Sequence, residues 1–250
     1  MTRTGRILRA TVFRAGKKRR VWIGMGWRIR LVVDPGAPLH KYIGTAEWEL
    51  AKWIKRFTER GTLCFDVGGY DAHVAMILAR RTRARVCCFE PEEERVARIR
   101  ENLKMNPTLA NHVRVVPTFV SDRTRLDPRE DTLDDLIAQG RVVEPDFLKI
   151  DVEGQEMGVL RGAAKLLAER KPHVLLEIHS NRLALECLVY LEELGYKPDR
   201  VPQRRWLKEN RGTGPNEWMA AYGQSRAEAD ARREMQMAGA EALTKQTGPA

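Results

Sequence analysis

The sequence predicts an α/β fold with a doubly wound, mostly parallel sheet and an antiparallel edge. Three observations support it. Apolar runs of strand length alternate with amphipathic helical patterns, a glycine pair follows one of these strands, and an acidic residue ends the next. The chain has 250 residues, 43% of them hydrophobic, which suits one domain with a sizeable core.

The glycine pair belongs to a predicted strand, turn and helix. Residues 62–67 form an apolar run that breaks at Gly68 and Gly69, and a helical pattern then places three apolar side chains on one face: Val74, Ile77 and Leu78. Glycine suits such a turn because it tolerates unusual backbone angles and lets a ligand approach the main chain. About twenty residues later a second strand ends in Glu90, whose carboxylate can accept hydrogen bonds from both hydroxyls of a ribose. Together, the glycine turn and Glu90 predict a nucleoside-binding site.

The residues around the turn favour one class of nucleoside. The segment lacks the Gly-x-Gly-x-x-Gly pattern that places a pyrophosphate on a helix N-terminus. Asp66 and Asp71 would repel a pyrophosphate but suit a ligand with an ammonium group, such as S-adenosylmethionine. The alternative is an ordinary βα turn in some other α/β protein, and Glu90 at the matching strand end argues against it.

The remaining elements follow in the order that a doubly wound sheet requires. An amphipathic helix over residues 45–60, with Trp48, Trp53 and Phe57 as packing residues, precedes the first strand. The other strands are expected at residues 113–120, 147–151 and 174–178, and the other helices at 91–105, 132–137, 156–169 and 181–194. Two last strands, at residues 196–201 and 217–222, form the antiparallel edge around a loop at residues 210–216.

The net charge of +10 lies entirely at the N-terminus, where residues 1–33 contain ten Lys or Arg and no Asp or Glu. A basic arm with two tryptophans could bind nucleic acid through its phosphates. The simpler interpretation is a solvated hairpin, with strands at residues 19–24 and 28–33 whose cations protect an exposed edge. An organellar transit peptide is a further alternative.

Composition excludes several classes of protein. No apolar run approaches the twenty residues that a membrane span needs, and the basic N-terminus lacks the apolar core of a secretory signal. The four cysteines have no Cys-x-x-Cys spacing, and we interpret them as reduced residues of the core. We therefore expect a cytoplasmic protein. We divide the chain into a basic extension (residues 1–60), a ligand-binding domain (61–223) and a polar, helical or disordered tail (224–250) without an assigned function.

Seven segments resemble the successive motifs of the FkbM-type methyltransferases. They are Asp66-Val-Gly-Gly-Tyr-Asp-Ala72, Phe89-Glu-Pro91, Val120-Ser-Asp122, Thr132-Leu-Asp-Asp-Leu136, Lys149-Ile-Asp-Val-Glu-Gly-Gln-Glu156, Leu160-Arg-Gly162 and Leu176-Glu-Ile-His179. The resemblance covers about residues 28–223 and implies a Rossmann-like class I fold, S-adenosyl-L-methionine as cofactor and, usually, O-methylation of a small molecule or a glycan. Ala72 departs from the family, which commonly has glycine there.

The candidate site residues lie at the carboxyl ends of the strands, where open α/β sheets bind their ligands. We expect Gly68 and Gly69 beside the methionine part of the cofactor and Glu90 on the ribose. Ser121 and Asp122 are expected at the adenine edge.

The catalytic candidates are Asp151, Glu153, Glu177 and His179. His179 suits the role of general base because imidazole titrates near neutral pH. Alternatively, Asp151 caps a helix and His179 caps a turn. The four side chains could also hold a divalent metal, but the sequence has no tight ligand motif, so none is assigned.

The sequence therefore predicts an S-adenosylmethionine-dependent methyltransferase that acts on a small hydroxylated acceptor such as a sugar, a glycan or a secondary metabolite. The alternatives are methylation of RNA or protein through the basic arm, and a binding module without turnover. Acceptor specificity is expected in residues 28–53 and 210–216. The oligomeric state does not follow from the sequence.

Overall fold

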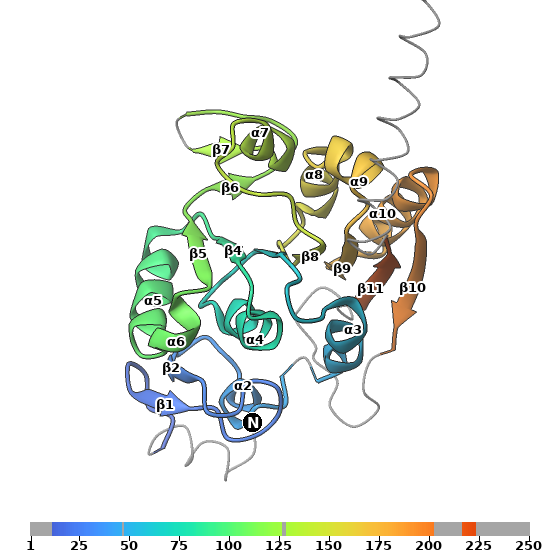
Figure 1. Ribbon diagram of the computed structural model, residues 1–250. Coiled ribbons are helices and arrows are strands. Elements are labelled where there is room, and N and C mark those ends of the chain that lie inside the picture. Colours follow the sequence, from blue (N-terminus) through green and yellow to red (C-terminus); the bar gives the residue numbers. More distant parts are fainter. Residues whose placement is uncertain (1–11, 47, 127–128, 203–216, 224–250) are drawn as a thin grey trace, which may run out of the picture.

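The computed structural model describes residues 12–46, 48–126, 129–202 and 217–223. Its centre is a seven-stranded sheet in the order β10-β11-β9-β8-β3-β4-β5 (Figure 1). The strands are β3 (Cys64–Val67), β4 (Val86–Phe89), β5 (Val113–Val116), β8 (Phe147–Ile150), β9 (His173–Ile178), β10 (Lys197–Val201) and β11 (Glu217–Tyr222). From β5 through to β9 all neighbours are parallel, and β11 pairs antiparallel with both β9 and β10. The predicted fold class is confirmed.

The order of the strands reverses between β3 and β8. From β3 the chain builds outward to β4 and β5, and it then returns to place β8 on the other side of β3. Every residue of β3, β4 and β8 is buried, as expected of parallel strands covered on both faces. Open α/β sheets bind ligands in the crevice outside the carboxyl ends of such a pair.

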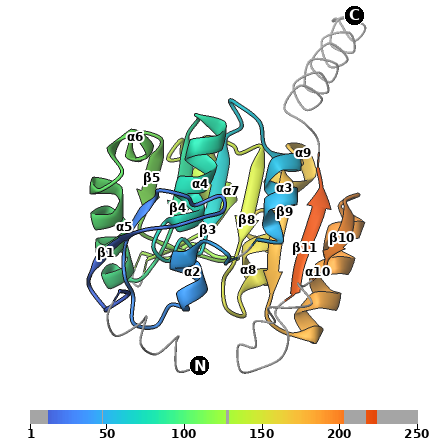
Figure 2. The same ribbon diagram turned by 90° about the horizontal axis from the view of Figure 1, so that it is seen from below.

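Helices cover both faces of the sheet, and each face has its own apolar core (Figures 1 and 2). One face carries α3 (Leu50–Phe57), α4 (His73–Thr82), α5 (Glu93–Lys104) and α6 (Pro107–Ala110). The other carries α7 (Leu133–Ala138), α8 (Glu156–Arg161), α9 (Ala164–Glu169) and α10 (Asn181–Glu193). The N-terminus of α7 is capped by Thr132, whose Oγ1 accepts a hydrogen bond from the Asp135 amide at 2.9 Å.

Three predicted elements differ from those observed. The helix predicted over residues 45–60 begins at Leu50, and Trp48 is 46% exposed rather than packed. The strand predicted over residues 113–120 ends at Val116 because Pro117 has no N–H to donate, and β6 (Phe119–Val120) pairs instead with β7 (Glu130–Asp131) in a small separate sheet.

The helix predicted over residues 156–169 is divided into α8 and α9. The carboxylate of Asp134 accepts hydrogen bonds from the amides of Lys165 and Leu166 at 2.8 and 3.0 Å, which caps a new helix. At the break, Gly162 approaches the Ser121 carbonyl so closely that a Cβ there would lie 1.8 Å from the oxygen. The break therefore joins the α8–α9 layer to the loop after β6.

The basic extension contains the predicted hairpin, with β1 (Lys18–Arg20) antiparallel to β2 (Arg30–Val32). Arg14, Lys17, Lys18 and Arg20 are exposed, as expected of a solvated hairpin. The free edge of β2 lies on α5, where the amides of Val32 and Arg30 donate hydrogen bonds to the side chains of Asn102 and Asn106 at 2.8 and 3.0 Å. After the hairpin comes a short helix, α2 (Leu39–Ile43).

Several predictions concern residues outside the described ranges: the start of the basic arm, the loop at residues 210–216 and the tail at 224–250. All four cysteines are buried and unpaired, in agreement with a reduced core. Among the described residues, no helix combines the length and apolar character that crossing a membrane requires.

Candidate functional site

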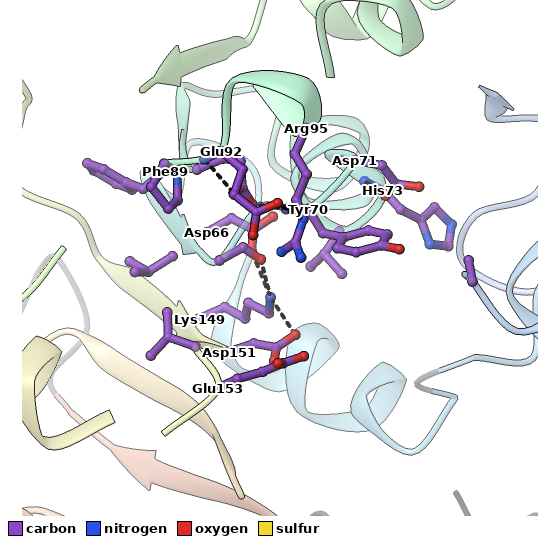
Figure 3. Close-up of a pocket in the computed structure, with 18 of the residues that line it drawn as sticks. Asp66, Tyr70, Asp71, His73, Phe89, Glu92, Arg95, Lys149, Asp151 and Glu153 are labelled. Atoms are coloured by element: carbon purple, nitrogen blue, oxygen red, sulfur yellow. Dashed lines mark hydrogen bonds and ion pairs between the residues drawn. The ribbon is translucent and has the colours of Figure 1, made fainter. Parts of the chain in front are cut away.

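A cavity of about 710 Å³ opens at the carboxyl ends of β3, β4 and β8. This volume suits a ligand of nucleoside size with room for a second small molecule. Its walls come from the turn after β3, the end of β4, the β5–β6 connection, the end of β8 and the segment around α2 (Figure 3). Among the lining residues are five of the seven predicted cofactor residues: Asp66, Gly68, Gly69, Asp71 and Glu90.

The two turn glycines are required by close packing. Gly68 has φ +84°, and a Cβ there would lie 1.8 Å from the carbonyl oxygen of Asp151, while one at Gly69 would lie 2.2 Å from the Cys88 sulfur. Both glycine amides donate hydrogen bonds to the Phe89 carbonyl, at 3.1 and 2.9 Å. The turn is thus fixed between the ends of β4 and β8.

The carboxylate of Glu90 is oriented by two main-chain amides. Its Oε2 accepts a hydrogen bond from Tyr70 at 2.8 Å and its Oε1 one from Glu92 at 3.1 Å. Burial raises the pKa of Glu90, and these hydrogen bonds act in the opposite direction. Each carboxylate oxygen can accept a further hydrogen bond, so Glu90 can still receive two hydroxyl groups from a ligand in the cavity.

Asp66 and Lys149 form a buried ion pair across the switch point of the sheet. The Lys149 ammonium lies 3.0 Å from Asp66 Oδ1 and 3.1 Å from Asp151 Oδ2, and it donates to the Gly68 carbonyl at 3.3 Å (Figure 3). Burial raises the pKa of Asp66, and Lys149 opposes that effect. The sequence analysis assigned Lys149 no role beyond its place in a motif. A lysine within the apolar strand at residues 147–151 could have indicated a buried ion pair.

Asp71 lines the cavity, but its carboxylate already has a cationic partner. Lys41 of α2 lies 2.8 Å from Asp71 Oδ2, and the Asp71 side chain is 1% exposed. The sequence predicted that this acidic turn would suit an ammonium group, and in the structure the chain's own lysine supplies one.

Ser121 and Asp122 lie outside the cavity lining as the described residues define it. The Ser121 hydroxyl donates to Glu130, and Asp122 pairs with Arg123 at 3.3 Å. The neighbouring residues Thr118, Phe119 and Val120 form this part of the wall instead. The predicted strand extended to Val120, but β5 ends at Val116. The residues that line the cavity after this strand are therefore 118–120 rather than 121 and 122.

The four catalytic candidates lie at the ends of β8 and β9, but only two of them, Asp151 and Glu153, are among the described residues that line the cavity. Although burial opposes it, Lys149 and a hydrogen bond with Glu177 lower the pKa of Asp151 to about 2. His179 Nε2 lies 3.9 Å from Asp151 Oδ1, whereas Lys149 pairs with the other carboxylate oxygen, Oδ2. The structure therefore brings Asp151, Glu177 and His179 together, with Asp151 at the cavity.

A buried carboxylate that sequence analysis missed orients His179. Glu156 Oε1 lies 2.5 Å from His179 Nδ1, and the Glu156 side chain is fully buried. Burial lowers the pKa of His179, but the hydrogen bond with Glu156 and the nearby charge of Asp151 raise it overall. The sequence places Glu156 at the end of a motif and the start of a helix but assigns it no role in the site.

The extension forms a wall of the cavity through a cluster around Tyr70. The Tyr70 hydroxyl donates to Asp34 at 2.5 Å, and Arg98 of α5 pairs with the same carboxylate. The cationic groups of Lys41 and Arg95 lie over the Tyr70 ring, 4.6 and 4.8 Å from its centroid. The sequence predicts acceptor specificity in residues 28–53, which include Asp34 and Lys41, but it assigns a role to none of the residues in this cluster.

Ala72 occupies a backbone conformation that favours glycine. Its φ is +62°, it is completely buried, and it directly precedes α4. Steric contact between Cβ and the following carbonyl makes this left-handed region costly for alanine. The FkbM-type methyltransferases that the sequence resembles commonly have glycine at this position, and glycine adopts the left-handed conformation without strain.

Comparison with known proteins places the chain among methyltransferases. The family model described as Methyltransferase FkbM domain matches residues 66–198, more than half of the chain. The hexuronic acid methyltransferase AglP of Haloferax volcanii is 26% identical over 153 residues, which cover 54% of this chain and 63% of that protein. The match thus spans less than two thirds of that relative.

Two solved structures resemble the fold. The methyltransferase FkbM from Methylobacillus flagellatus KT has a TM-score of 0.53 at 19% identity, covering 65% of this chain and 44% of that one. The precorrin-6Y C5,15-methyltransferase from Geobacter metallireducens GS-15 has a TM-score of 0.52 at 19% identity, covering 71% and 88%. These likenesses support a Rossmann-like fold. The family model, which matches more than half of the chain, shows that the chain belongs to the FkbM family of methyltransferases.

Proposed function

We propose that the protein transfers a methyl group from S-adenosylmethionine to an oxygen atom of a small hydroxylated acceptor, a sugar or a sugar acid. Membership of the FkbM family implies S-adenosylmethionine as the methyl donor. The observation that supports the donor site most directly is Glu90, held at the cavity wall by two amides with acceptor capacity to spare. The sugar-acid acceptor is favoured by the 26% identity to a hexuronic acid methyltransferase.

The cofactor fits the residues present. Glu90 would hold the ribose hydroxyls, and the turn at Gly68 and Gly69, which lines the cavity, would pass beside the methionine part. The adenine would lie against Phe119 and Val120, which line the cavity next to the end of β4. When bound, the cofactor supplies an electrophilic methyl group on a sulfonium.

Methyl transfer forms a carbon–oxygen bond to the acceptor and breaks the carbon–sulfur bond, which leaves S-adenosylhomocysteine. The hydroxyl proton of the acceptor has to leave as well. Asp151 and Glu153 line the cavity, and Asp151 is ionised, so its carboxylate can accept a hydrogen bond from the acceptor hydroxyl and align its oxygen. The predicted destination of this proton is His179, whose Nε2 lies 3.9 Å from Asp151 Oδ1, or solvent when that nitrogen is otherwise engaged.

An acceptor screen tests this function. The purified protein would be incubated with S-adenosylmethionine and a panel of hexuronic acids, neutral sugars and RNA, and S-adenosylhomocysteine would be measured. We expect turnover with at least one sugar or sugar acid, reduced at least about 100-fold in Asp151→Asn, since positioning and proton handling each contribute that much. Turnover with RNA alone, or cofactor binding without turnover of any acceptor, would contradict the proposal.

A further inference from the structure

We infer that Asp151, Glu177 and His179 form a binding site for one divalent cation of the Mg²⁺/Mn²⁺ class at the acceptor side of the cavity. Each of the three residues offers one ligand atom, and these atoms all lie within 4.8 Å of one another. Bonds of about 2.1 Å place neighbouring ligand atoms about 3 Å apart and opposite ones about 4.2 Å apart, so side-chain shifts of roughly 1 Å would complete the site.

The imidazole of His179 has the orientation of a metal ligand. Its Nδ1 is hydrogen bonded to Glu156 at 2.5 Å, and its Nε2 is inaccessible to solvent and has no hydrogen-bond partner among the described residues. Metal-bound histidines commonly use one ring nitrogen for the metal while a carboxylate fixes the other. Glu156 is fully buried, and apart from His179 its Oε1 accepts only a long hydrogen bond from the Gly154 amide, at 3.4 Å, among the contacts described.

The charge around the site favours a cation. Four carboxyl groups, those of Asp66, Asp151, Glu156 and Glu177, lie within this buried region of the described chain, together with one lysine and one histidine. Lys149 is held between Asp66 and the Oδ2 atom of Asp151, while His179 lies near Oδ1, the other oxygen of Asp151.

The ligand set indicates which cation binds. Two carboxylates and one imidazole suit Mn²⁺ and Mg²⁺ better than the thiolate-preferring metals, and all four cysteines lie elsewhere as free thiols in the core. Because Asp151 also lines the cavity, a cation on it would reach an oxygen of the acceptor, lower the pKa of that hydroxyl and fix its direction. This role rests on the proposed function, whereas the existence of the site does not.

Direct binding of Mn²⁺ tests the site without an activity assay. The full-length protein would be treated with a chelator, dialysed and titrated with Mn²⁺, and free Mn²⁺ would be followed by electron paramagnetic resonance. We expect one bound Mn²⁺ per chain. Glu177→Gln and His179→Gln should each weaken binding at least about tenfold, and so should Glu156→Gln, which removes only the residue that orients His179.

Glu192→Gln, an exposed substitution on α10, is the matched control and should bind Mn²⁺ like the wild type. Circular dichroism would establish that each variant is folded. Because His179 is partly accessible and Glu177 is buried, His179→Gln keeps the test decisive if Glu177→Gln does not fold. No Mn²⁺ binding at millimolar concentration, or equal affinity in wild type and His179→Gln, would overturn the inference.

A cofactor titration on the same preparation separates this inference from the proposed function. If Mn²⁺ binds and S-adenosylmethionine does not, the cation site stands and the methyltransferase proposal falls. If methylation proceeds at full rate after chelation and no Mn²⁺ binds, the proposed function stands and the cation site is rejected.

Discussion

Asp66 and Lys149 are register partners on neighbouring parallel strands, and their side chains form a buried ion pair of 3.0 Å at the point where the sheet reverses its strand order. Lys149 also lies 3.1 Å from Asp151, so a single ammonium group links the end of β3 to the residue that we propose aligns the acceptor. The same side chain therefore affects both stability and the geometry of the site.

Removing Lys149 should destabilise the protein strongly. In Lys149→Met, Asp66 remains fully buried without its partner, and breaking such a pair costs about 3–5 kcal/mol. Urea unfolding would measure the loss. The double variant Asp66→Asn/Lys149→Met should lose less than the single Lys149→Met because the uncompensated charge is gone. A loss below about 1 kcal/mol in Lys149→Met would show that the pair is not held as described.

Ala72→Gly should stabilise the protein by about 0.5–1 kcal/mol. Relief of the left-handed conformation is worth about 1–2 kcal/mol, and the greater flexibility of glycine in the unfolded chain offsets part of it. Thermal and urea unfolding would detect the change. Ala75→Gly, inside α4 at a buried helical position, is the matched control and should destabilise. A loss of stability in Ala72→Gly would contradict the assigned backbone conformation.

His73 should make stability depend on pH. Burial, with smaller contributions from Lys41 and Arg80 that outweigh the opposing effect of Asp71, lowers its pKa to about 4 from 6.5. The unfolded state then binds a proton between these values and the folded state does not, so stability is complete above about pH 6.5 and falls as the pH drops toward 4, by about 3 kcal/mol in all.

The comparison with His73→Gln isolates this effect from the titration of carboxylates. Urea unfolding between pH 4 and 7 should show a shallower dependence in the variant than in the wild type. Parallel pH profiles for the two proteins would mean that His73 titrates normally. His112→Gln, on the connection before β5, changes a histidine that is less buried and serves as the control.

Asp34→Asn should loosen the extension from the domain. Asp34 accepts hydrogen bonds from Tyr70 and Arg98, and although burial opposes it, these partners lower its pKa. Loss of the charge should cost about 1–3 kcal/mol in unfolding free energy and weaken cofactor binding, because Tyr70 also carries the amide that orients Glu90. Asp199→Asn, an exposed change on β10, should leave both measurements unaltered, and equal behaviour of the two variants would contradict the role of Asp34.

The parts of the site that depend on local sequence could be predicted. The strand, the glycine turn and Glu90 follow from hydrophobic patterning and spacing within about thirty residues, and the structure places them in one cavity. The Lys41–Asp71 and Tyr70–Asp34 contacts could not be predicted, because they depend on how the extension folds back over the domain, which no local pattern in the sequence encodes. Ser121 and Asp122 were assigned to the adenine edge because Pro117 was not recognised as the end of a strand.

Binding of S-adenosylmethionine to wild type and to Glu90→Gln, measured by calorimetric titration, tests the central claim most directly. Glutamine keeps the shape of Glu90 but loses its charge, and a hydrogen bond to a charged group contributes about 1.5–3 kcal/mol. The account predicts one cofactor per chain and about 10–100-fold weaker binding in Glu90→Gln. It also predicts unchanged binding in Glu94→Gln, an exposed control on α5. No binding to the wild type, or equal affinity in Glu90→Gln and wild type, would contradict it.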